Sequence, residues 1–266
     1  MAGTMGLNKI LGDLEGYLRL AVEEKYPPEE VSREVIRGLA KASFGNSVKL
    51  AMPVPPSAVN ANVPPAVRGV SSGHPGLLEI AETVAACRKC SLYATRTRVV
   101  PGQGSSSPEI MFVGEAPGAD EDLQGLAFVG AAGKLLTKMI EAMGYTRDQV
   151  FIGNILKCRP PGNRNPEPDE IAACEKFLFR QIDSVQPKVI CALGAFSAKT
   201  LLRTNEPISR LRGHLVDYRG AKLMATFHPA YLLRNPIEKR KVWEDVQVIR
   251  EPVGIRLPGY LLLSIP

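Results

Sequence analysis

Four apolar runs separated by helical patterns are the feature that most constrains the fold of this chain. The runs lie at 110–113, 150–156, 189–193 and 222–227. Helical periodicity falls between or after them, near 131–143, 167–184, 195–203 and 236–250. Continuous apolar strands that alternate with helices are typical of a mostly parallel sheet that is covered on both faces. We therefore expect an α/β fold with these strands in one sheet.

Three of the four predicted strands end in residues that carry chemistry. Gly114 and Glu115 follow the first strand, Asn154 lies in the second, and the last leads to His228. Because the carboxyl ends of parallel strands meet at one edge of a sheet, these side chains should share one crevice. Phe128, just before the next helical pattern, adds an aromatic ring. A carboxylate, an amide, an imidazole and a ring suit the recognition of a planar heterocycle, and no Ser-His-Asp order indicates a nucleophile.

Composition sets only broad limits on function. The 266 residues carry a formal net charge of +6 with a pI of about 9.1, which fits a polyanionic partner such as nucleic acid without requiring one. No run of eighteen apolar residues spans a membrane, and the first residues do not read as a secretory signal. We therefore expect a cytoplasmic protein with reduced cysteines.

The pattern also divides the chain into three parts. Residues 1–75 form an extension that is helix-like over 7–43 and then rich in proline and alanine, as in a linker. Residues 76–249 carry the alternating strands and helices, and 250–266 form an apolar, proline-broken tail. The helical part, within residues 1–50, can serve as a docking segment for a protein partner.

Five cysteines give a separate signal. Cys87 and Cys90 form a CxxC pair, Cys158 and Cys174 lie sixteen positions apart, and Cys191 sits inside an apolar strand. Four thiolates can hold zinc or an iron–sulfur cluster, and the spacing alone does not choose between them. A different interpretation is that all five are buried structural thiols. Cys191 is expected to pack as a small hydrophobe.

Three segments together resemble a known family. The resemblance is carried by GEAPGADED followed by FVGAAGKLL, by NILKCRPPGNRNPEPDE and by FHPAYLLRNP. In these segments the chain resembles the family 4 uracil-DNA glycosylases, the iron–sulfur members of their superfamily. The resemblance covers roughly residues 77–249. It implies a three-layer α/β/α fold with a central four-stranded parallel sheet and a 4Fe–4S cluster. By position, the ligands of that cluster are Cys87, Cys90, Cys158 and Cys174.

The resemblance also implies an activity in base excision repair. Such an enzyme flips uracil out of single- or double-stranded DNA and hydrolyses its N-glycosidic bond, leaving an abasic site. We expect a monofunctional, monomeric glycosylase with Glu115, Asn154 and His228 as catalytic residues. The expected uracil-binding residues are Gly114, Glu115, Ala116, Phe128, Asn154 and His228.

Contacts to the DNA itself are expected from phosphate binders and from a wedge. Gly133 and Lys134 open a helix whose N-terminus suits a phosphate. Arg159 and Arg164 flank the cysteine-bearing loop, and Leu232 with its neighbour Leu233 can fill the gap that a flipped base leaves. These expected DNA-binding residues are Gly133, Lys134, Arg159, Arg164 and Leu232.

The sequence leaves several interpretations open. A related branch traps uracil covalently through a histidine inserted after the first motif, but here residues 122–125 lead directly to Phe128 without one. A non-catalytic iron–sulfur DNA-binding protein with the same fold is a second alternative, although the joint presence of Glu115, Asn154 and His228 argues against it. The cysteines alone also suit a zinc scaffold. Glu115 either orients water or stabilises the sugar cation, and Glu121 either contacts the base or caps a helix.

Overall fold

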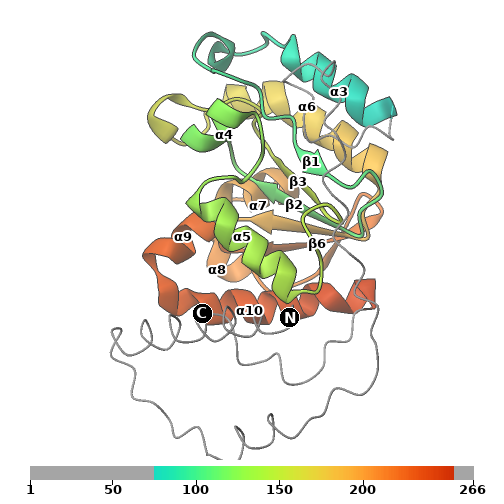
Figure 1. Cartoon of the computed structure of the whole chain (residues 1–266). Helices are drawn as coiled ribbons and strands as arrows, with labels where there is room; N and C mark the ends of the chain where they lie inside the picture. Colours follow the sequence, from blue (N-terminus) through green and yellow to red (C-terminus); the bar gives the residue numbers. More distant parts are fainter. Residues whose placement is uncertain (1–74, 255–266) are drawn as a thin grey trace, which may run out of the picture. The chain divides into compact units, whose positions relative to one another are not determined.

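The computed structural model describes residues 75–254, and these build one six-stranded sheet (Figure 1). Its strand order is β1-β3-β2-β4-β6-β5. The four inner strands are parallel to one another, as the sequence predicts. The strands are β1 (Gln103–Gly104), β2 (Ile110–Gly114), β3 (Phe151–Asn154), β4 (Val189–Leu193), β5 (Val216–Tyr218) and β6 (Ala221–Thr226).

The two edge strands were not predicted. β1 and β5 run antiparallel to β3 and β6 and contain only 2 and 3 residues. Neither has an apolar run, because the residues of β1 are half-buried and those of β5 are largely exposed. The predicted run at 150–156 yields a shorter strand that ends at Asn154, directly opposite Gly114 of β2.

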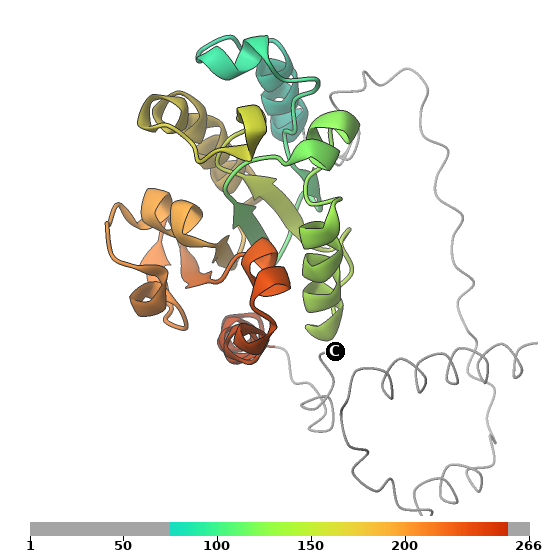
Figure 2. The same ribbon diagram turned by 90° about the vertical axis from the view of Figure 1, so that its left-hand side faces the viewer.

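Helices cover both faces of this sheet, which confirms the three-layer α/β/α arrangement (Figures 1 and 2). Side chains of each strand alternate, so that Met111 and Val113 of β2 pack toward α3, α6 and α7. Ile110 and Phe112 pack on the other face toward α5, α9 and α10. The helices are α3 (Pro75–Ala85), α4 (Ala119–Gln124), α5 (Ala131–Ala142), α6 (Pro168–Val185), α7 (Ala195–Leu202), α8 (Ile208–Leu211), α9 (Pro229–Arg234) and α10 (Lys239–Val253).

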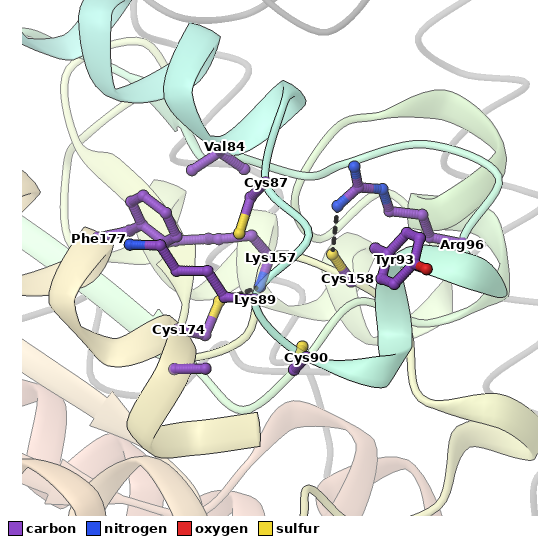
Figure 3. Close-up of a pocket in the computed structure, with 11 residues that line it drawn as sticks. Val84, Cys87, Lys89, Cys90, Tyr93, Arg96, Lys157, Cys158, Cys174 and Phe177 are labelled. Atoms are coloured by element: carbon purple, nitrogen blue, oxygen red, sulfur yellow. Dashed lines mark hydrogen bonds between the residues drawn. The ribbon is translucent and has the colours of Figure 1, made fainter. Parts of the chain in front are cut away.

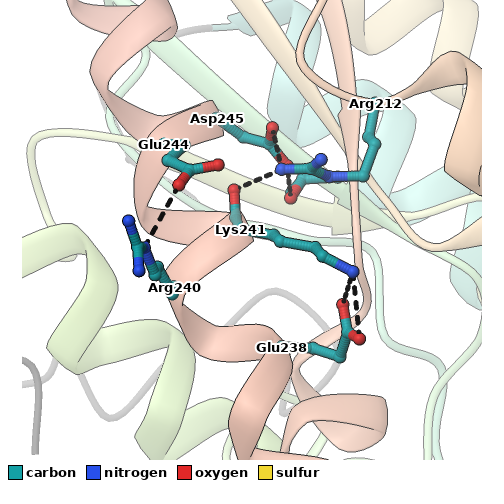
Figure 4. A network of polar contacts seen from close by, with 7 residues as sticks. Arg212, Glu238, Arg240, Lys241, Glu244 and Asp245 are labelled. Atoms are coloured by element: carbon teal, nitrogen blue, oxygen red, sulfur yellow. Dashed lines mark hydrogen bonds and ion pairs between the residues drawn. The ribbon is translucent and has the colours of Figure 1, made fainter.

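The last helix is fixed to the sheet by a buried ion pair (Figure 4). Arg212 donates to both carboxylate oxygens of Asp245, at 2.7 and 3.1 Å. Thr226, the last residue of β6, donates its hydroxyl to the same carboxylate. The Asp245 carboxylate therefore ties α10 both to Arg212 and to the end of β6, two residues before His228. α10 continues through Val253, past residue 250, where the sequence suggested a tail.

The expected N-terminal helices and linker lie outside the described residues. Among the helices of residues 75–254, none combines the length and the apolar composition that crossing a membrane requires.

Candidate functional site

A cleft of about 420 Å³ opens at the carboxyl ends of the inner strands. Its lining includes five of the expected base-binding residues, namely Glu115, Ala116, Phe128, Asn154 and His228. They come from the turn after β2, the loop before α5, the end of β3 and the start of α9. The structure thus brings together in one cleft the side chains that we expected to meet at the strand ends.

Gly114 lies where two of these side chains converge. A Cβ atom at this position would lie 2.4 Å from Asn154 Oδ1 and 2.6 Å from Phe128 Cζ. Both distances are far below van der Waals contact, so only glycine lets the amide and the ring approach the strand end together.

Phe128 is held in an uncommon backbone conformation, with φ of 52°. The residue is 6% exposed, and its ring lies 5.6 Å from the His228 ring, centroid to centroid, with an interplanar angle of 32°. Gly133 of α5 supports this loop, because a Cβ there would lie 1.9 Å from the Phe128 carbonyl oxygen. Gly133 is buried, which fits a role in admitting the Phe128 backbone, and its contact with DNA stays a prediction.

The acidic stretch after β2 is a set of loop anchors. Glu121 accepts hydrogen bonds from the backbone N–H groups of Gly118 at 3.0 Å, Val129 at 2.8 Å and Gly130 at 2.9 Å. The carboxylate thereby joins the turn after β2 to the loop that carries Phe128. Asp122, which is 3% exposed, accepts from the backbone N–H of Thr97 at 2.9 Å. Of the two roles considered for Glu121, the structure favours capping.

Asn154 offers an unpaired acceptor to the cleft. The residue is 1% exposed, and its Oδ1 atom is buried without a hydrogen-bond partner in the described part of the chain. A buried polar atom that is left unpaired costs free energy of about 1–3 kcal/mol, so such atoms usually await a ligand or a water molecule. The amide is therefore poised for a donor that enters the cleft.

His228 forms the N-cap of α9, and its Nδ1 atom accepts the backbone N–H of Ala230 at 3.1 Å. Burial lowers the pKa of His228 to about 4, with the charge of Arg234 acting in the same direction. The ring is neutral at pH 7, and because Nδ1 is the acceptor, the proton sits on Nε2. The imidazole can therefore donate one hydrogen bond through Nε2 without carrying a charge.

The pKa of Glu115 is shifted in the direction opposite to that of His228. Burial raises the pKa of its carboxyl group to about 7. A carboxylate that titrates near neutral pH is a better proton acceptor than an ordinary glutamate.

The residues expected to bind DNA divide into two groups. Lys134 is exposed on the first turn of α5. Arg159 donates to the Asn163 side chain at 2.7 Å, and Arg164 makes two hydrogen bonds to the Glu170 carboxylate at 2.6 and 2.9 Å. Those two arginines brace the loop between β3 and α6, although Arg164 also lines the cleft.

The predicted wedge needs a correction. Leu232 is 1% exposed and belongs to the core beneath α9, whereas Leu233 is 47% exposed. In the structure Leu233 is therefore the leucine that can contact DNA. Sequence reasoning also passed over Arg234, an exposed cation on the wall of the cleft. Its position in the segment FHPAYLLRNP was the available signal.

The four expected ligand cysteines face a common space beside α3 and α6 (Figure 3). Cys87 and Cys90 come from the loop after α3, Cys158 follows β3, and Cys174 lies in α6. Cys191 lies apart from them, fully buried within β4. Burial raises the pKa of the Cys158 thiol and raises that of Cys174 to about 12.

Two cations lie against these thiols. Arg96 Nη1 is 3.1 Å from Cys158 Sγ, and the fully buried Lys157 neighbours both Cys158 and Cys174. Within residues 75–254, no three histidine, cysteine or acidic side chains are close enough to hold a single metal ion. A cluster of several iron atoms is larger than one ion, so its cysteines need not converge on a point. The buried Lys157, the half-buried Arg96 and the common space fit a group that keeps the sulfur atoms anionic.

The fold and the cleft define a class of protein: a three-layer α/β/α domain with a site for a planar ligand at the strand ends. The model of the uracil DNA glycosylase superfamily matches residues 101–247, more than half of the chain. The chain belongs to this superfamily, and within it to the type-4 family that its three motifs resemble.

Curated relatives named type-4 uracil-DNA glycosylase are similar over about two thirds of this chain. The protein from Sulfurisphaera tokodaii is 49% identical over 184 residues, covering 66% of this chain and 84% of the relative. The protein from Archaeoglobus fulgidus is 43% identical over 188 residues, covering 68% and 94%. The protein from Saccharolobus solfataricus is 46% identical over 184 residues, covering 66% and 85%.

Proposed function

We propose that this protein is a monofunctional uracil-DNA glycosylase that removes uracil from single- or double-stranded DNA and leaves an abasic site. The observation that carries the proposal is the buried, unpaired Oδ1 of Asn154 in a cleft that also holds Phe128 and His228. Family membership supports the same reaction. A base inside a duplex is out of reach, so the nucleotide must first be flipped at a cost of a few kcal/mol.

Recognition of the flipped base rests on Phe128 and Asn154. The ring at the wall of the cleft can stack on any base, for about 1–3 kcal/mol. The amide of Asn154 selects among bases, because it offers an acceptor to uracil N3–H and a donor to uracil O4. Cytosine presents the reverse pattern and would leave buried groups unpaired, which a site of this kind rejects by about 10⁴-fold.

Departure of the base is assisted by His228. As the N-glycosidic bond breaks, its electron pair moves onto the uracil ring and negative charge collects at O2. The neutral imidazole, with its proton on Nε2, donates to that oxygen and stabilises the charge where it develops. The hydrogen bond from Ala230 to Nδ1 fixes the tautomer that makes this possible.

The sugar side of the reaction falls to Glu115. The deoxyribose becomes cation-like in the transition state, and water attacks its C1′ carbon. An ionised Glu115 stabilises this positive charge and accepts the proton of the attacking water. Its raised pKa of about 7 suits proton acceptance near neutral pH.

The cysteine site supports the protein and takes no part in these steps. Cys87, Cys90, Cys158 and Cys174 would hold a 4Fe–4S cluster, which supplies cross-linking of the loop after α3 to β3 and α6. The neighbouring Arg96 and Lys157 favour anionic sulfur over neutral thiol. A brown protein with a broad absorption band near about 400 nm and about four iron atoms per chain is expected. A colourless protein with one zinc ion per chain would favour the zinc scaffold.

DNA contact is assigned to the cleft rim. Lys134, Leu233 and Arg234 are exposed, and Arg234 lines the cleft. We infer that the two cations bind phosphate and that Leu233 fills the gap in the duplex. We further propose that residues 76–249 form the glycosylase domain and act as a monomer. A protein partner for residues 1–50 and the cytoplasmic location stay predictions.

The test compares wild type with His228→Ala on a uracil-containing oligonucleotide followed by alkali cleavage. Strands treated with wild type should break at uracil when alkali is added, and abasic sites should form about 10²–10³-fold more slowly with the variant, as for loss of one oxyanion donor. Unchanged cleavage by His228→Ala would refute its role and leave the function standing. DNA binding without any cleavage by wild type would instead favour the non-catalytic iron–sulfur protein. A covalent adduct with the oligonucleotide would identify a uracil-trapping relative.

A further inference from the structure

Lys157 is a fully buried lysine that the reaction scheme leaves without a role. Its side chain is 1% exposed and is among the largest buried side chains of the described residues. Lysine is almost never buried to this extent unless hydrogen bonds and opposite charge offset the loss of hydration. Its partners therefore show what the lysine does in the fold.

The ammonium group donates to two neutral acceptors. Lys157 Nζ donates to the backbone carbonyl of Asn154 at 2.8 Å and to Gln181 Oε1 at 2.7 Å. Gln181 of α6 is itself buried, and its Nε2 donates to the carbonyl of Pro101 at 2.6 Å. The lysine thus joins α6 to the main chain of the residue that faces the cleft.

The carbonyl of Asn154 needs this partner because of where β3 ends. β1 pairs with β3 only as far as Ile152, so it does not reach the last residue of the strand. On the other side, Gly114 of β2 lies opposite Asn154 and accepts from Ile155. The ammonium group therefore supplies the hydrogen bond to the Asn154 carbonyl that a neighbouring strand would otherwise donate.

The same residue also contacts the cysteine site through its main chain. The backbone N–H of Lys157 donates to Cys174 Sγ at 3.3 Å, and Cys158 is the next residue along the chain. Lys157 is labelled among the cysteines in Figure 3. One residue therefore contacts the main chain of Asn154 through its side chain and a cysteine through its backbone.

We propose that Lys157 is a positioning residue for base recognition, which holds the Asn154 main chain so that its amide faces the cleft. The inference rests on the proposed function and deepens it. It assigns selectivity for uracil partly to a residue that never touches the base.

The experiment compares Lys157→Met and Gln181→Met with wild type, all as full-length, iron-containing protein. Methionine keeps the length of each side chain and removes its hydrogen-bonding head. Lys188→Met is the matched control, since Lys188 pairs with Glu109 on the surface. Binding is measured to an oligonucleotide with uncleavable 2′-fluorouridine and to the same strand with an abasic site.

A positioning role predicts that affinity for the uracil analogue falls by about tenfold in both variants. Affinity for the abasic strand should change by less than about twofold, because that strand makes no base contact. Equal losses on both strands, or no loss on either, would overturn the proposal. If Lys157→Met loses iron or fails to fold, Gln181→Met decides, since the Gln181 side chain bonds to Lys157 and to the Pro101 carbonyl. Failure of wild type to excise uracil would refute the proposed function instead.

Discussion

At the scale of single residues, the cleft holds two titratable groups whose pKa values are shifted in opposite directions. Burial disfavours charge in both cases, so it raises the pKa of Glu115 to about 7 and lowers that of His228 to about 4. Slightly above neutral pH, the cleft therefore contains a carboxylate and a neutral imidazole. This combination matches the cation-like sugar and the anionic base of the proposed transition state.

The pH dependence of activity follows from the Glu115 carboxyl group. Because the ionised form is the active one, kcat/KM should rise about tenfold between pH 6 and pH 8, with a midpoint near 7. His228 is already neutral throughout this range, so its titration adds no second slope to the profile of kcat/KM against pH. Steady-state excision measured from pH 5 to 9 checks the midpoint. In Glu115→Gln the rate should be lower and this limb should disappear; a limb that persists in the variant assigns it to another group.

At the scale of elements, the sharp turn after β2 depends on Gly114. In Gly114→Ala the new methyl group would displace the Asn154 amide or the Phe128 ring, since it would lie 2.4 Å from one and 2.6 Å from the other. We expect uracil excision to fall by about 10²-fold, comparable to the loss of a well-oriented group. Gly153→Ala is the matched control in β3, where the nearest atom is 3.5 Å away. Equal activity of the two variants would contradict the account of this turn.

The attachment of α10 gives a second prediction at this scale. Asp245→Ala leaves Arg212 without its partner, and breaking such a buried pair costs about 3–5 kcal/mol. The midpoint of thermal unfolding should fall by about 10 °C for a domain of this size. Glu244→Ala removes an exposed pair with Arg240 on the same helix and should change the midpoint by about 1 °C. A similar fall of the unfolding midpoint in both variants would show that the buried pair stabilises the fold no more than the exposed pair does.

Several elements were predictable because their patterns are local. The apolar runs marked all four parallel strands, and the strand-end residues Glu115, Asn154 and His228 were found as a group. The anchoring by Glu121 and Asp122 was not predictable, since their partners lie up to 25 residues away in loops without a pattern. Leu232 and Leu233 differ only in which side of α9 they occupy, and a helix of 6 residues gives too little periodicity to tell.

Lys157 shows the limit of sequence reasoning most clearly. A lysine between a strand and a cysteine is expected to reach solvent, yet here it is buried beside α6. Its acceptor Gln181 lies 24 residues away, and only the folded chain brings the two together.

At the scale of the whole molecule, every residue that lines the cleft or the cysteine site lies between 84 and 234. We therefore predict that a chain beginning at residue 75 keeps its iron and excises uracil within about twofold of the full-length rate. Excision by both forms under identical salt conditions checks this, because phosphate contacts are sensitive to salt. Loss of excision with retained iron would instead assign residues 1–74 a part in DNA binding.

The central claim is that the cleft selects uracil and that the protein breaks its bond to the sugar. Free base released from otherwise identical oligonucleotides with one uracil, cytosine or thymine tests it most directly, with wild type beside Asn154→Asp. Wild type should release about one uracil per strand and essentially no cytosine or thymine, and Asn154→Asp should be slower on uracil by at least about 10²-fold. Absence of uracil release by the iron-containing wild type, or full activity and selectivity in Asn154→Asp, would contradict the account.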